Sequence, residues 1–144
     1  MGRNKKRRIN PSQSPNQGER LKVHEVSPTG STNHLHPIFN LEHLGGAYCL
    51  SKCTQEEKAA FADKIHLLSQ LTWAQISHAP RHGLGYESIP RHQLNVSTFP
   101  PELTPDVKIL SFRFHGLAPM IGYRDNRVFV VLILDRDYTA YNHE

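Results

Sequence analysis

Apolar and polar side chains alternate with a period of two over residues 108–115, which predicts a β-strand with one face on the core. Two further apolar runs follow at residues 120–124 and 127–134, each after a short turn signal. The last run is apolar at every position after its first, as expected of a strand at the centre of a sheet. The last third of the chain therefore predicts a three-stranded antiparallel β-meander.

A helical pattern precedes the meander. Thr54 stands three residues before Glu57, a pair that caps the N-terminus of a helix, and apolar residues then recur at helical spacing. This pattern predicts a helix over residues 55–70. A second capping pair that begins at Thr72 predicts a short helix, which Pro80 ends.

Two remaining segments complete the order of elements. Residues 38–41 are mostly apolar and predict a short strand, whereas residues 80–106 are rich in proline and glycine and predict a long loop. The predicted fold class is α+β, with an N-terminal strand, two helices and then the three-stranded meander.

The register of the meander predicts a cluster of arginines. A two-residue hairpin turn would pair Arg124 with Arg127. A four-residue loop at 116–119 would place Arg113 opposite Gly122, so that three guanidinium groups share one face. Like charges in apposition indicate an anion bound between them, unless the arginines reach solvent or pair with nearby aspartates. The other, core face would hold Phe112, Phe114, Ile121, Tyr123, Val128, Val130 and Leu132.

The net charge of +4 belongs to the N-terminal segment. Residues 1–30 carry seven basic and two acidic side chains, whereas the rest of the chain carries ten basic and eleven acidic ones. Residues 1–34 hold almost no large apolar side chain, so we predict a disordered basic tail at 1–34 and a single domain at 35–144. The tail either solubilises the protein or attracts RNA and the ribosome. Its basic cluster consists of Lys5, Lys6, Arg7 and Arg8.

The sequence predicts a soluble cytoplasmic protein with no membrane association. No apolar run approaches the roughly 18 residues that span a bilayer, and no apolar stretch follows the basic N-terminus. Cys49 and Cys53 are too few for a disulfide framework and predict two reduced thiols.

The whole chain has ten histidines, which together with the arginines outside the tail indicate acid–base chemistry on a phosphodiester. Cleaving RNA without a metal or another cofactor needs a base for the 2′-hydroxyl, cations for the phosphorane and an acid for the leaving oxygen. Three arginines are predicted to bind the substrate: Arg81, Arg91 and Arg127. The residues that would supply the three chemical roles are Arg81, His82, Arg113, Arg124, Tyr141 and His143.

Other chemistries have weaker signals. Asp135 and Asp137 form a D-x-D at a strand end, which suits a divalent cation or, more often, a salt-bridged strand terminus, so we predict no metal site. The chain has no P-loop and no nucleophile elbow.

The order of elements and four segments together resemble the RelE/ParE toxin superfamily. The segments are Phe112-Arg113-Phe114, the "Y-R" strand at 120–124, the apolar strand at 128–134 and the closing segment at 135–141. The resemblance implies a RelE-like fold over residues 36–144. It also implies an endoribonuclease that cleaves mRNA on the ribosome and is neutralised by a protein antitoxin.

The same resemblance implies roles for particular residues. Arg113 and Arg124 would hold the scissile phosphate, and Tyr141 or His143 would transfer a proton. The alternative is a non-catalytic ParE-like inhibitor, or a nucleic-acid-binding protein that acts through a broad surface.

Overall fold

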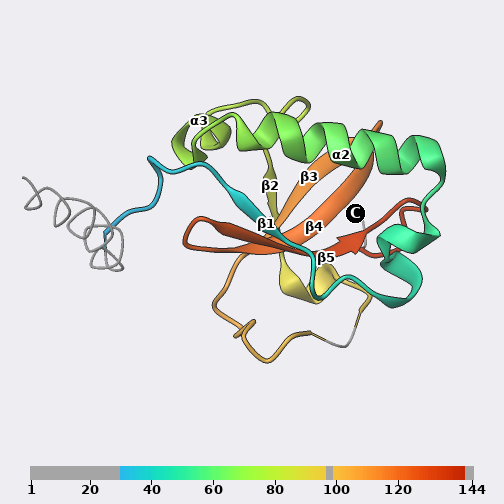
Figure 1. Ribbon diagram of the computed structural model, residues 1–144. Helices are drawn as coiled ribbons and strands as arrows, with labels where there is room; N and C mark the ends of the chain where they lie inside the picture. The colour runs from blue at the N-terminus through green and yellow to red at the C-terminus, as the bar shows by residue number, and fades with distance from the viewer. Residues whose placement is uncertain (1–29, 97–98, 142–144) are drawn as a thin grey trace, which may run out of the picture. The chain divides into compact units, whose positions relative to one another are not determined.

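A five-stranded mixed sheet with two helices on one face forms the core of the molecule (Figure 1). The computed structural model describes residues 30–96 and 99–141. The strand order is β1-β5-β4-β3-β2; β1 is parallel to β5, and the other neighbours are antiparallel. The α+β class is therefore confirmed. The strands are β1 (Ile38–Asn40), β2 (Glu87–Ile89), β3 (Ile109–His115), β4 (Ala118–Asp125) and β5 (Val128–Leu134).

The two helices begin where their capping residues predict. In α2 (Gln55–Ser69) the backbone N–H of Glu57 donates to the Thr54 hydroxyl at 3.1 Å, and the Thr54 N–H donates back to the Glu57 carboxylate at 2.7 Å. Thr72 and Gln75 make the same reciprocal pair in α3 (Trp73–Ser77). Both predicted helices are confirmed. The sequence could predict them because each cap joins residues only three positions apart.

The long connection contains a strand that the sequence analysis missed. Residues 87–89 pair with β3 as the edge strand β2, so the sheet has five strands instead of the predicted four. The segment is only three residues long, and Gly85 and Pro90 stand close on either side of it. Its pairing with β3 makes it a strand, since three residues have no periodicity of their own to recognise.

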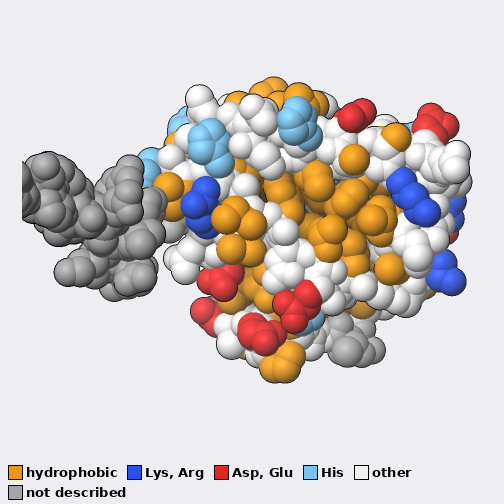
Figure 2. Space-filling model, in the orientation of Figure 1, with side chains coloured by type: hydrophobic (Ala, Val, Ile, Leu, Met, Phe, Trp, Pro, Cys, Tyr) orange, Lys and Arg blue, Asp and Glu red, His pale blue; other side chains and the backbone are white. Residues whose placement is uncertain are grey.

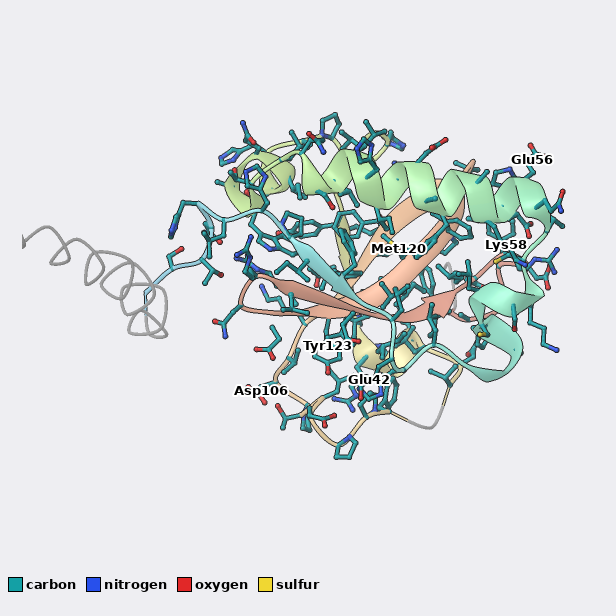
Figure 3. All side chains as sticks on the ribbon, viewed as in Figure 1. Glu42, Glu56, Lys58, Asp106, Met120 and Tyr123 are labelled. Carbon is teal, nitrogen blue, oxygen red and sulfur yellow. The ribbon has the colours of Figure 1, made fainter. Side chains whose placement is uncertain are left out.

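Side chains of the sheet are buried on both faces. One core lies between the sheet and the helices, with Trp73, Phe112 and Phe129 at its centre. The second lies between the sheet and the 89–107 connection. Figure 3 shows the labelled Met120 on the helix side of β4 and Tyr123 on the opposite side, and both are buried.

The predicted register of β3 against β4 is wrong. The turn is Gly116-Leu117 instead of a four-residue loop, and Arg113 pairs with Pro119 instead of Gly122. Gly116 adopts a φ of +59°, which permits this tight turn, and an irregularity in the pairing between Arg113 and His115 accommodates Pro119. Because this shift of three residues is an odd number, each side chain of β3 shares its face with the β4 side chains that were predicted to lie on the other face.

The second hairpin turns one residue later than predicted. Asn126 and Arg127 form its turn, with Asn126 at a φ of +58°, and Arg124 pairs with Phe129 instead of Arg127. This change shifts the register by two residues and leaves the faces unchanged, so Tyr123, Val130 and Leu132 still share one core.

The predicted single core face is consequently divided between the two sides of the sheet. Phe112 and Phe114 pack under the helices. The other members lie on the opposite side: Ile121, Tyr123, Val128, Val130 and Leu132.

Residues 32–36, part of which the sequence analysis assigns to the tail, are hydrogen-bonded to the domain. The Ala74 N–H donates to the Asn33 carbonyl at 2.8 Å, and the Trp73 N–H donates to the Leu35 carbonyl at 3.0 Å. Beyond them, β1 forms the exposed edge of the sheet, with Ile38 half exposed. Apolar side chains gather below α2 on the face that Figure 2 shows.

The basic cluster at residues 5–8 lies outside the described residues. In the described part of the chain, none of the helices has both the length and the apolar character that crossing a membrane requires.

Gly122 is a position where an added methyl group should be costly. A Cβ there would lie 2.0 Å from the Val130 carbonyl oxygen, next to the pairing irregularity between Ile121 and Gly122. Gly122→Ala should therefore lower the free energy of unfolding by about 2 kcal/mol, measured by urea denaturation. Gly45→Ala is the matched control, because no atom lies within 4 Å of its Cβ position. An equal effect of the two changes would contradict this account of Gly122.

Candidate functional site

A pocket of about 300 Å³ opens where β3 and β4 approach their connecting turn. Two arginines, a carboxylate and two tyrosines line it, and these come from four separate parts of the chain. The lining residues are Arg81, Glu87, Ser111, Arg113, Leu117, Pro119, Tyr138 and Tyr141.

Glu87 connects the groups in this pocket. One carboxylate oxygen forms an ion pair with the Arg81 guanidinium, and the other accepts a hydrogen bond from the Tyr141 hydroxyl at 3.2 Å. Pairing of β2 with β3 places Glu87 opposite Ser111, which lies on the same wall. Glu87 is not among the site residues that the sequence predicts, because the pattern of residues 80–106 indicates a loop.

Arg81 and His82 lie in a tight turn that starts at Pro80. The backbone N–H groups of Gly83 and Gly85 both donate to the Pro80 carbonyl at 2.9 Å. A Cβ on Gly85 would lie 2.2 Å from the Ala79 carbonyl oxygen, so the turn closes only around a glycine. This closure brings Arg81 beside the pocket.

Arg113 and His82 are hydrogen-bonded to each other. Nη1 of Arg113 lies 2.7 Å from Nδ1 of His82. A guanidinium has donors only, so Nδ1 accepts this hydrogen bond and the ring carries its proton on Nε2. His82 is exposed and is not among the residues that line the pocket, and its Nε2 can still donate a hydrogen bond.

A buried carboxylate holds the segment that bears the two tyrosines. Asp135 is fully buried, and its two carboxylate oxygens accept the backbone N–H groups of Thr139 at 2.8 Å and Ala140 at 3.0 Å. Ala140 is itself buried, and the carbonyl of Ala140 accepts the Asn95 N–H at 2.6 Å. These bonds turn the chain after β5 back across the sheet, so that Tyr141 reaches Glu87.

Burial is the largest factor that raises the pKa of the Tyr141 phenol. The negative charge of Glu87 and its hydrogen bond raise this pKa further, and Arg113 and Arg81 oppose them. The phenol therefore keeps its proton at neutral pH.

Arg124 does not join Arg113. It lies on the helix side of the sheet, where its guanidinium stacks over the Trp73 ring at 4.3 Å and donates to the Thr32 hydroxyl at 2.9 Å. Burial lowers the pKa of Arg124. The predicted cluster of three arginines is therefore wrong, because the actual register places Arg113 on the opposite face.

Two other predicted arginines also lie outside the pocket. Arg127 is in the hairpin turn and donates to the His36 carbonyl at 3.0 Å. Arg91 stacks on Phe99 at 4.5 Å and donates to the Leu103 carbonyl at 3.1 Å. Both stabilise connections of the fold. His143 and the basic cluster of the tail lie outside the described residues.

The metal alternative at Asp135 and Asp137 has little support from the geometry. Both oxygens of Asp135 are already used by backbone N–H groups, and Asp137 lies 3.9 Å from Arg136. Within residues 30–96 and 99–141, no group of three acidic, histidine or cysteine side chains is arranged to hold a metal ion.

The chain was compared with models of known protein families, curated proteins and solved structures, and none of them matches it. The site is therefore described by its own groups: a pocket lined by two guanidinium groups, a carboxylate and two tyrosines, beside β2 and β3.

An ion pair attaches the segment behind the pocket to the start of α2. Nε of Arg136 donates to Oε1 of Glu57 at 2.7 Å. This hydrogen bond, followed by that from the Thr54 backbone, lowers the pKa of Glu57 below its ordinary value of 4.5.

Acid should therefore destabilise the fold partly through Glu57. A pKa lowered by folding means that the stabilisation is present above pH 4.5 and is lost as the pH falls through the lowered value. Glu57→Gln should make the decline in unfolding free energy below this pH shallower, measured by urea denaturation across a pH series. Arg136→Gln should have the same effect, because it removes the largest cause of the shift. An acid decline as steep as that of the wild type in both variants would contradict this role.

Proposed function

We propose that this protein is a toxin-like endoribonuclease that cleaves mRNA by acid–base catalysis in the pocket around Glu87. The observation that carries the proposal is the hydrogen-bonded group of Arg81, Glu87 and Tyr141, with Arg113 on the same wall. Together these side chains offer two cations, a base and an acid. These are the groups that cleavage of RNA at a 2′-hydroxyl requires.

The two guanidinium groups would bind the scissile phosphate. Guanidinium donors match the geometry of phosphate oxygens and keep their charge at all physiological pH values. As the 2′-oxygen attacks phosphorus, negative charge grows on the non-bridging oxygens. Arg81 and Arg113 then stabilise this charge more strongly than they stabilise the ground state.

Proton transfer completes the reaction. Glu87 accepts the proton of the 2′-hydroxyl, the 2′-oxygen–phosphorus bond forms, and the bond from phosphorus to the 5′-oxygen breaks. Tyr141 donates a proton to the leaving 5′-oxygen. The products are a 2′,3′-cyclic phosphate and a 5′-hydroxyl, and no redox partner is needed.

The resemblance to the RelE/ParE superfamily supports the same proposal. The strand, two helices and antiparallel meander occur in the expected order, and Arg113 and Tyr141 lie at one pocket. Arg124 lies outside the pocket and does not take the phosphate-binding role that the resemblance implies. Glu87 supplies a carboxylate base, which is not among the residues that the resemblance implies. The proposed partners are therefore ribosome-bound mRNA as substrate and a protein antitoxin that covers the pocket.

Substitutions in the pocket test this mechanism. Arg113→Ala should slow cleavage by about 100-fold or more, because one source of charge stabilisation is lost. Glu87→Gln should slow it by about 100- to 10,000-fold, because the base is lost. The assay follows end-labelled RNA with the purified full-length protein, with and without ribosomes, in the presence of a chelator. The product ends are identified chemically.

Arg127→Ala is the matched control, since Arg127 lies in the turn between β4 and β5, outside the pocket. It should cleave at the wild-type rate. Equal losses in the Arg113 and Arg127 variants would contradict the assignment of the pocket.

Expression in a bacterium with mapping of RNA 5′ ends tests the substrate class. Cleavage in register with codons would support ribosome-bound mRNA as substrate. Growth arrest with intact RNA would contradict the proposal and favour the non-catalytic alternative.

A further inference from the structure

Two large apolar side chains stand exposed on the walls of the charged pocket. Leu117 is 64% exposed and Tyr138 is 47% exposed, and both line the same cavity as Arg81 and Arg113. Three other large apolar residues in the described part of the chain are also exposed, and none of the three lines this pocket: Ile38, Leu41 and Leu67.

The backbone of Tyr138 adopts a conformation that disfavours an aromatic residue. Its φ is +59°, in the left-handed region that L-residues other than asparagine and aspartate rarely occupy. The Asp135 carboxylate maintains this conformation by accepting the N–H groups of Thr139 and Ala140, the two residues that follow. Strained backbone conformations that the surrounding structure maintains occur mainly at functional sites. The position of the Tyr138 side chain is therefore a candidate for a role in ligand binding.

Leu117 is positioned by the β3–β4 turn. The turn has only two residues, and Gly116 takes the positive φ that it requires. Leu117 is consequently held at the turn, on the pocket wall to which Arg113 and Pro119 also contribute. The pocket thus combines cations with an aromatic ring and an aliphatic side chain.

This combination matches a nucleotide. An inorganic phosphate or a carboxylate would use the guanidinium groups but gain nothing from exposed apolar walls. A nucleotide has an anionic phosphate and, a few ångströms away, a flat base that stacks on aromatic and aliphatic surfaces. We propose that Tyr138 and Leu117 form a stacking subsite for the nucleobase next to the phosphate bound by Arg81 and Arg113; this inference rests on the proposed function and extends it.

Binding of an uncleavable ligand tests the subsite separately from catalysis. The probes are a trideoxyadenylate, which has no 2′-hydroxyl, and an abasic trimer of the same charge. Their dissociation constants are measured by NMR titration of the full-length protein. The two trimers carry the same charge, so any attraction to the basic tail is common to both, and the ratio of the two constants reports the contribution of the bases. Wild type should prefer the base-containing trimer by about tenfold, the size expected for one stacked base.

Variants locate this preference. Tyr138→Asn keeps a residue type that accepts positive φ but removes the ring, and it should abolish most of the preference. Leu117→Ala should reduce the preference, whereas Tyr138→Phe should retain it. Leu67→Ala is the matched control, an exposed leucine on α2 that does not line the pocket.

The outcomes separate the two proposals. Equal affinity of the wild-type protein for the two trimers would overturn the stacking subsite, even if RNA cleavage is observed. A preference that survives in both Tyr138→Asn and Leu117→Ala would also overturn it. A preference that these variants lose would support the subsite, even if no RNA is cleaved and the proposed function fails.

Discussion

The pairing of β3 with β4 across the Gly116-Leu117 turn determines the chemistry that each face of the sheet carries. Because adjacent residues of a strand point to opposite faces, this register directs Phe112 and Phe114 towards the helices and Arg113 away from them. It also places Leu117 beside the pocket. A register shifted by an odd number of residues would turn the guanidinium under α2 and move the two phenylalanine rings to the opposite face, where the pocket opens. The helix-side core therefore strongly favours the register that also forms the site.

The rest of the site depends on segments without regular structure that are held by buried polar groups. Asp135 replaces the lost strand pairing after β5 with two carboxylate–backbone hydrogen bonds, and Gly85 permits the close turn that carries Arg81. Such segments keep one conformation only when their backbone groups find partners, and here the N–H groups of Gly83, Gly85, Thr139 and Ala140 do. The pocket is therefore formed in advance of any ligand. A preformed arrangement of charges suits a site that stabilises developing charge.

The arginines of the domain have two different physical roles. Arg124 is stacked on Trp73, and Arg127 is hydrogen-bonded to the His36 carbonyl, so both contribute to the packing of the N-terminal residues. Arg81 and Arg113 instead meet Glu87 and His82 at the pocket, where their donors face a space that an anion could fill. Residue type alone does not separate these roles. The difference lies in which face of the sheet, and which turn, each residue occupies.

The sequence alone determined the elements whose causes are local. Capping pairs at Thr54 and Thr72 and the alternation in β3 predicted both helices, the central strands and the α+β class, because these signals act over a few residues. Arg81, His82, Arg113 and Tyr141 were also selected from the sequence. Only the tertiary structure decided the register, the strand β2 and the entry of Glu87 into the site. Each of these depends on pairing between distant segments, and a change of one or two residues in a turn alters that pairing without a comparable change in local pattern.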